Sequence, residues 1–263
     1  MALFAALRVL ILFAMGFTVA LLITPVVYRA LVRWNLRKRN IRDAATAPVF
    51  YAHHKDKSST PTMGGIIIWA TVAGLALLFS GASWLFDGFA SYLNFVNRAE
   101  TYLPLAALLV AALVGFVDDL WGILGRGAKG GGLGMGHKLA LYSAIAGLGA
   151  WWFYVKLGWE TLYVPFVGYL ALGGWYVPVF MFVIVATAFS TNETDGLDGL
   201  AAGTLFFSFG AFAVVAFILG RYDLAAMIAV LLGALLAFLW YNIYPARFFM
   251  GDTGSMSLGI TLG

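Results

Sequence analysis

Long apolar stretches are the feature of this sequence that most restricts what it can fold into. They recur along the whole chain, and their lengths approach or reach the roughly 20 helical residues that cross a hydrocarbon core of about 30 Å. Continuous runs predict helices, because membrane strands would appear as short segments of alternating hydropathy. We predict spans at Leu7–Val27, Thr62–Gly81, Thr101–Val117, Lys138–Val155, Trp175–Phe189, Leu200–Leu219 and Leu224–Asn242, and the start of an eighth near Ser255.

The composition agrees with a chain that lies in a bilayer. Of the 263 residues, 62% are hydrophobic and only 11% are charged, which leaves too little polar surface to face water. We therefore expect an all-α polytopic membrane protein with seven to eight transmembrane helices, built as a single membrane-embedded domain over residues 1–263. The absence of cysteine excludes disulfides and thiolate metal sites.

The charges of the loops predict how the chain is oriented. If the spans alternate, 12 of the 16 Lys and Arg residues fall on one face, most of them between residues 29 and 57. The positive-inside rule makes that face cytoplasmic and places the N-terminus outside. The other loops of the same face receive five aspartates, namely Asp118, Asp119, Asp195, Asp198 and Asp252. The acidic residues should therefore gather on the cytoplasmic side.

These aspartates belong to three short motifs, GFVDDLWG, NETDGLDG and FFMGDTGS. Adjacent ionised carboxylates repel each other unless a cation lies nearby or one proton is retained. Asp195 and Asp198, three residues apart, would share one side of a helical turn. Each motif alone also fits an exposed helix end, a polar turn or a helix cap. Three acidic clusters on one face favour a hard cation such as Mg²⁺, which binds one or two carboxylates together with phosphate oxygens.

The segment AHHKDKSSTPTMGG adds donors for phosphate to the same face. Lys57, Thr60 and Thr62 supply ammonium and hydroxyl groups suited to phosphate oxygens. The basic stretch 29–42 fits better as an anchor on anionic lipid. Reasoning from the residues thus reaches a metal and phosphates, but neither a sugar nor a lipid.

Four motifs, STPTMGG, GFVDDLWG, NETDGLDGLAAG and PARFFMGDTGS, resemble those of the polyprenyl-phosphate N-acetylhexosamine-1-phosphate transferases in sequence and order. STPTMGG favours the phospho-N-acetylmuramoyl-pentapeptide transferase branch. The resemblance implies transfer from UDP-MurNAc-pentapeptide to undecaprenyl phosphate, forming lipid I and UMP with Mg²⁺ as cofactor, in the bacterial cytoplasmic (inner) membrane. We expect the lipid bilayer as a partner and no nucleic acid. A homodimer is a further candidate assembly.

The resemblance also implies roles for individual residues. Asp118 would deprotonate or position the lipid phosphate, Asp119 would be its essential neighbour, and Asp252 would bind the metal. The implied catalytic residues are Asp118, Asp119, Asp195 and Asp252, and the implied substrate-binding residues are Lys57, Thr62, Lys138, Asn192, Asp198, Asn242 and Phe249, with Asp198 and Phe249 at the uracil. Because the family continues past the eighth span through a histidine-bearing loop and further helices, we expect this chain to be C-terminally truncated.

Two other functions stay open at this point. A UDP-N-acetylglucosamine:polyprenyl-phosphate N-acetylglucosamine-1-phosphate transferase would keep the chemistry and change the sugar. A non-catalytic membrane protein, either a cation transporter or a lipid-binding scaffold, would be a different class. A transporter would place acidic residues near the bilayer midplane along a pathway, whereas here the acidic residues gather at the ends of the predicted spans.

Overall fold

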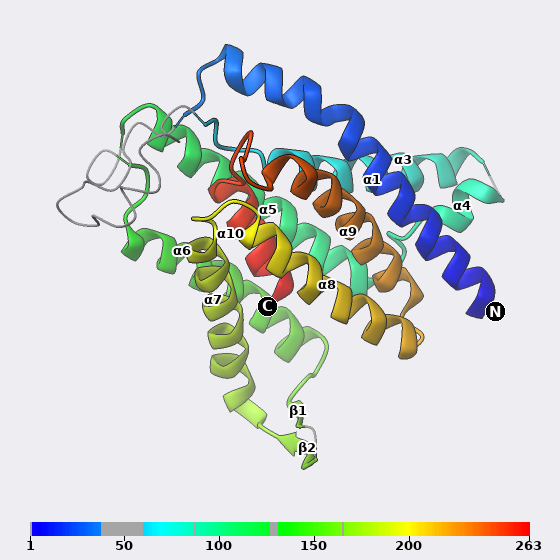
Figure 1. The fold of residues 1–263 in the computed structure, drawn as a ribbon. Helices are drawn as coiled ribbons and strands as arrows, with labels where there is room; N and C mark the ends of the chain where they lie inside the picture. The colour runs from blue at the N-terminus through cyan, green and yellow to red at the C-terminus, as the bar shows by residue number, and fades with distance from the viewer. Residues whose placement is uncertain (1, 38–59, 87, 127–130, 165) are drawn as a thin grey trace.

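Helices form nearly all of the regular structure in the described part of the chain (Figure 1). The computed structural model describes residues 2–37, 60–86, 88–126, 131–164 and 166–263. The elements are α1 (Ala2–Arg33), α3 (Ile66–Leu85), α4 (Phe89–Leu93), α5 (Ala99–Ile123), α6 (Met135–Trp151), a π-helical turn (Trp152–Lys156), β1 (Thr161–Val164), β2 (Gly168–Ala171), a 3-10 turn (Gly173–Trp175), α7 (Tyr176–Thr194), α8 (Leu200–Ile218), α9 (Tyr222–Asn242) and α10 (Asp252–Leu262).

Six of the described helices are long and apolar enough to cross a membrane, namely α1, α3, α5, α7, α8 and α9. The α-helical part of α6 has 17 residues, and the π-helical turn extends it without a break to Lys156. The prediction of an all-α polytopic membrane protein is therefore confirmed. The start expected near Ser255 belongs to α10, which begins three residues earlier, at Asp252.

The sequence did not predict the short helix α4 or the hairpin of β1 and β2. The two strands pair antiparallel, with Thr161 opposite Ala171 and Val164 opposite Gly168. The hairpin connects the end of α6 to the start of α7. It therefore lies at the opposite ends of these two helices from the residues discussed below (Figure 1).

Helix α9 is the central helix of the bundle. Of its 21 residues 14 are buried, against five of the 32 residues of α1. It packs most extensively against α1 on one side and α8 on another. Small residues let α1 and α9 approach closely, as in many membrane helix pairs. A Cβ at Gly233 would lie 2.2 Å from the carbonyl oxygen of Phe13, and one at Gly16 would lie 2.4 Å from that of Val230.

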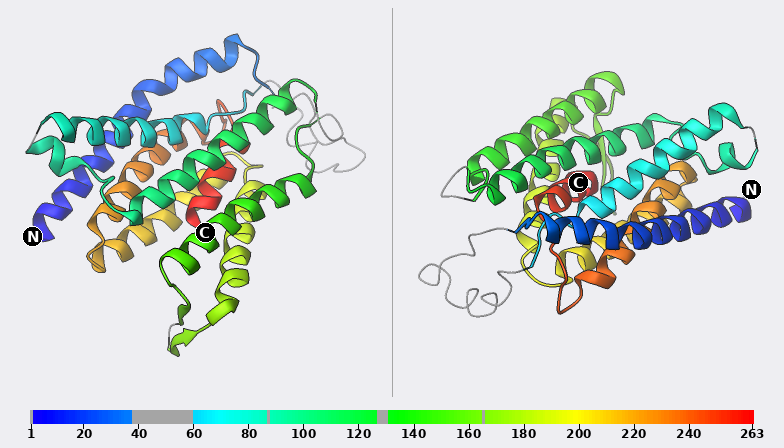
Figure 2. Two further views of the ribbon diagram at one scale, coloured as in Figure 1. Left: turned by 180° about the vertical axis from the view of Figure 1, so that it is seen from behind. Right: turned by 90° about the horizontal axis from the view of Figure 1, so that it is seen from above.

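The short helix α10 lies between α5 and α7, its most extensive neighbours (Figure 2). Nine of its 11 residues are buried. Glycines permit this fit as well, because a Cβ at Gly259 would lie 2.8 Å from the Cα of Ala188 in α7. The first turn of α10 is thereby placed near the start of α6 and the end of α7.

Gly233→Ala tests the close contact of α1 and α9. The added methyl group would collide with backbone atoms, so the two helices must separate, at a cost of about 1–3 kcal/mol. We expect a lower thermal midpoint in detergent. The matched control is Gly210→Ala in α8, where a Cβ meets nothing within 4 Å and alanine is the better helix former. Equal midpoints for the two variants would contradict this packing.

Candidate functional site

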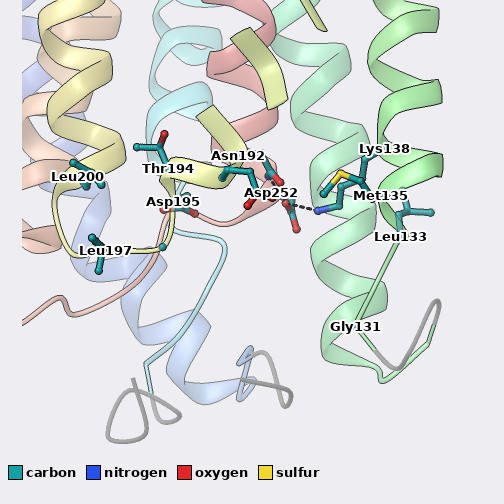
Figure 3. A pocket seen from close by; sticks show the side chains of 12 residues that line it. Gly131, Leu133, Met135, Lys138, Asn192, Thr194, Asp195, Leu197, Leu200 and Asp252 are labelled. Atoms are coloured by element: carbon teal, nitrogen blue, oxygen red, sulfur yellow. Dashed lines mark hydrogen bonds and ion pairs between the residues drawn. The ribbon is translucent and has the colours of Figure 1, made fainter. Parts of the chain in front are cut away.

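A polar cleft of about 580 Å³ opens where α6 begins, α7 ends and α10 begins (Figure 3). Three helix termini form it, because each helix carries a polar residue in its terminal turn: Lys138 in α6, Asn192 in α7 and Asp252 in α10. The lining residues are Gly131, Leu133, Met135, Lys138, Asn192, Glu193, Thr194, Asp195, Gly196, Leu197, Leu200 and Asp252.

Lys138 connects two carboxylates that come from distant parts of the chain. Its Nζ lies 2.7 Å from Oδ1 of Asp252 and 2.9 Å from Oδ2 of Asp118. The side chains of Lys138, Asp252 and Asp118 are 13%, 7% and 1% exposed. One ammonium thus faces two buried carboxyl groups.

Asn192 joins α7 to the same centre. Its Nδ2 donates to Oδ1 of Asp252 at 2.6 Å and to Oγ of Ser255 at 2.8 Å. The backbone N–H of Leu133 donates to Oδ1 of Asp118. Residues of α5, α6, α7 and α10 therefore form one network, which we call the polar centre: Asp118, Lys138, Asn192 and Asp252.

Asp119 and Asp195 hold the backbone on either side of Asp252. Oδ2 of Asp119 accepts a hydrogen bond from the N–H of Thr253, and Oδ2 of Asp195 accepts one from the N–H of Gly251, both at 2.9 Å. Gly251 has a φ of +74°, and a Cβ there would lie 2.6 Å from Oδ2 of Asp119. The motif therefore needs glycine at this position. Both carboxylates fix the direction in which Asp252 points into the cleft.

Asp198 and Asn242 do not line the cleft, although Asp198 directly follows its lining residue Leu197. Asp198 accepts a hydrogen bond from the N–H of Ala246 at 3.1 Å. Asn242 accepts one from the N–H of Gly199 and donates one to the carbonyl of Phe248. These contacts connect the loop after α7 to the loop before α10.

The prediction that Asp195 and Asp198 share one side of a helical turn is wrong. Helix α7 ends at Thr194, and the two carboxylates accept hydrogen bonds from different residues of the loop before α10. The physical reason is that the backbone at Asp195 is no longer helical, with φ −76° and ψ 51°, and that Gly199, with a φ of +75°, redirects the chain directly before α8.

Thr62 and Phe249 lie at the junction of residues 60–65 with the loop before α10. The N–H of Thr62 donates to the carbonyl of Leu36, and the N–H of Phe249 donates to that of Pro61. Lys57 falls outside the described residues. Ser255 and Glu193 were not assigned from the sequence. The spacing of Ser255, three residues after Asp252 in a helix, is the signal that could have identified it.

The donors in the cleft fit Mg²⁺ held jointly with a phosphate-bearing ligand. Within the described ranges, no three His, Asp or Glu side chains form a metal centre of their own. The cleft offers carboxylate oxygens of Asp252 and Asp195 and the amide of Asn192. These are hard ligands, and Mg²⁺ commonly uses only one or two carboxylates, with phosphate oxygens and water completing its shell.

Comparison with known proteins identifies relatives over most of the chain. Residues 101–263, which contain all of α5 except its first two residues, the elements up to α10 and the whole polar centre, match the family described as Glycosyl transferase family 4. The phospho-N-acetylmuramoyl-pentapeptide-transferase of Chloroflexus aggregans is 37% identical over 80% of this chain and 55% of its own length. Proteins of the same name from Chloroflexus aurantiacus and Desulforamulus reducens are 35% and 39% identical, over 97% and 81% of this chain. The chain spans 55% to 66% of the length of these three relatives.

Lys138→Met tests whether the ammonium is what allows two carboxylates to be buried together. Removing one partner of a buried ion pair costs about 3–5 kcal/mol, because the remaining charges lose their compensation. We expect a lower thermal midpoint in detergent. Added Mg²⁺ should raise the midpoint of the variant more than that of the parent, because the cation replaces the lost charge. The matched control is Lys156→Met, at the far end of α6, where the lysine lies over the ring of Trp151. Equal midpoints for the two variants would contradict the assignment.

Proposed function

The chain belongs to glycosyl transferase family 4, and from this we propose that the whole protein transfers a sugar phosphate from a nucleotide carrier to a lipid phosphate. The donor is UDP-MurNAc-pentapeptide, the acceptor is undecaprenyl phosphate, and the products are lipid I and UMP, in peptidoglycan synthesis. Relatives named phospho-N-acetylmuramoyl-pentapeptide-transferase, at 35% to 39% identity, support this choice of substrates.

The observation that carries the proposal is the polar centre at the ends of apolar helices. A polyprenyl phosphate keeps its tail in the bilayer and its phosphate at the interface, so it can meet a soluble nucleotide only where helices end. Lys138, Asn192 and Asp252 all lie in terminal turns. A transporter would instead place its charged groups along a pathway near the bilayer midplane.

The residues of the centre have distinct tasks in this reaction. Lys138 donates to phosphate oxygens and offsets the charge that develops on them. Asp118, buried beside it, orients the attacking lipid phosphate or accepts its proton. Asp119 and Asp195 keep the start of α10 in place. When bound by Asp252 and Asn192 together with substrate phosphates, Mg²⁺ supplies charge neutralisation of the diphosphate.

The loop charges support a cytoplasmic location for the cleft. The positive-inside rule places the basic loops, and with them the start of α6 and the end of α7, on the cytoplasmic side. UDP-linked sugars are soluble in the cytoplasm, so the cleft would open toward its donor. We propose the bacterial inner membrane on the same grounds.

Asp252→Asn in the full-length protein tests the proposal. The parent should release UMP from UDP-MurNAc-pentapeptide when polyprenyl phosphate and Mg²⁺ are present. Asparagine keeps the size of the side chain and removes its charge, so turnover should fall by about a hundredfold or more. Because Asp252 is buried against Lys138, the thermal midpoint of each variant is measured alongside turnover.

The matched control is Glu160→Gln, an exposed residue next to β1, which should leave turnover unchanged. Turnover of Asp252→Asn within about threefold of the parent at limiting Mg²⁺ would contradict the role of Asp252. A lipid product formed from UDP-N-acetylglucosamine, and none from the muramoyl donor, would overturn the proposed sugar. The absence of UMP release by the parent would overturn the reaction itself.

A further inference from the structure

Tyr142 in α6 is a buried tyrosine that the mechanism above does not use. Its side chain is 0% exposed, and its ring belongs to an apolar cluster with Ala111, Ala146, Ile184, Ala188, Met256 and Ile260. Within the part of the chain that the structure describes, its hydroxyl makes no hydrogen bond. Burying a hydroxyl without a partner is unfavourable, so its presence in place of phenylalanine needs a reason.

The ring lies one helical turn below the polar centre. Tyr142 follows Lys138 by four residues, so both lie on one face of α6. The same spacing relates Met256 to Asp252 in α10 and Ala188 to Asn192 in α7, and both apolar residues pack in the cluster around Tyr142. Three helices therefore place the tyrosine directly beneath the centre.

The direction of the side chain brings the hydroxyl toward that centre. Long side chains in a helix lean toward its N-terminus, over the preceding turn. For Tyr142 the preceding turn carries Lys138, and the N-terminus of α6 opens into the cleft. Lys138 in that turn is paired with the carboxylates of Asp118 and Asp252, whose oxygens accept hydrogen bonds.

We propose that Tyr142 is a positioning residue whose hydroxyl donates a hydrogen bond, through one water, to the carboxylates of the polar centre. The bond holds Asp118 and Asp252 in the arrangement that receives the substrate phosphates. The catalytic consequence rests on the proposed function, whereas the hydrogen bond itself does not. A tyrosine that only fills apolar space would make no such bond.

Tyr142→Phe in the full-length protein removes the hydroxyl and keeps the ring. We expect kcat to fall about tenfold, as the loss of one hydrogen bond to a charged group implies. KM for the nucleotide sugar should stay within about twofold, because the tyrosine acts through the carboxylates and not on the nucleotide. The thermal midpoint should fall as well. The matched control is Tyr176→Phe, a buried tyrosine at the opposite end of α7 from Asn192, which should leave kcat unchanged.

The sign of the change in thermal midpoint distinguishes a tyrosine that makes the hydrogen bond from one that only fills apolar space. Removing a hydroxyl that has no partner would leave the midpoint equal or raise it. A Tyr142→Phe variant with kcat within about twofold of the parent and an equal or higher midpoint would overturn the proposal. If the parent shows no transfer, the proposed function fails, and the midpoint alone decides: a lower value supports the hydrogen bond, and an equal or higher value overturns it.

Discussion

The ion pairs of Lys138 with Asp118 and Asp252 determine how α5, α6 and α10 can be arranged. Two ionised carboxylates cannot be buried side by side without a compensating cation, because their desolvation and mutual repulsion are too costly. The three residues come from positions 118, 138 and 252, so the pairing connects distant segments of the chain. Asn192 extends the same network to α7. The cleft is therefore a consequence of how these charges are satisfied at the ends of four apolar helices.

Small residues and backbone hydrogen bonds give this arrangement its geometry. Glycines let α10 lie in close contact with α5 and α7, so its first turn reaches the cleft. The carboxylates of Asp119 and Asp195 accept hydrogen bonds from the backbone on either side of Asp252. The N-terminus of α10, with its partial positive charge, faces the cleft together with Lys138. The buried ammonium and the hard oxygen ligands of this centre are consistent with the phosphates and the divalent cation that we propose as its ligands.

Sequence reasoning reached the spans and the acidic face because hydropathy and loop charge act over whole segments. It placed Asp118, Asp195 and Asp252 on one side. In the structure Asp195 and Asp252 line one cleft, and Asp118 is buried beside it, paired with Lys138. It could not pair Lys138 with Asp252, since no local pattern relates residues 114 positions apart, and only the family resemblance pointed to Lys138. The shared helical side of Asp195 and Asp198 was predicted wrongly because α7 ends at Thr194 and both aspartates lie in the loop before α8. The hairpin of β1 and β2 was not predicted, because its strands have only four residues each.

The coupling between Lys138 and Asp252 tests the account most directly, by a double-mutant cycle on the free energy of unfolding of the full-length protein. The cycle compares Lys138→Met, Asp252→Asn and the double variant. If the ion pair organises the site, the double variant loses less stability than the sum of the single variants, by at least about 1 kcal/mol, because neither partner is left buried and uncompensated. Additivity of the two single effects within about 0.5 kcal/mol would show that the two residues are energetically independent. That result would contradict the conclusion that the ion pair organises the site.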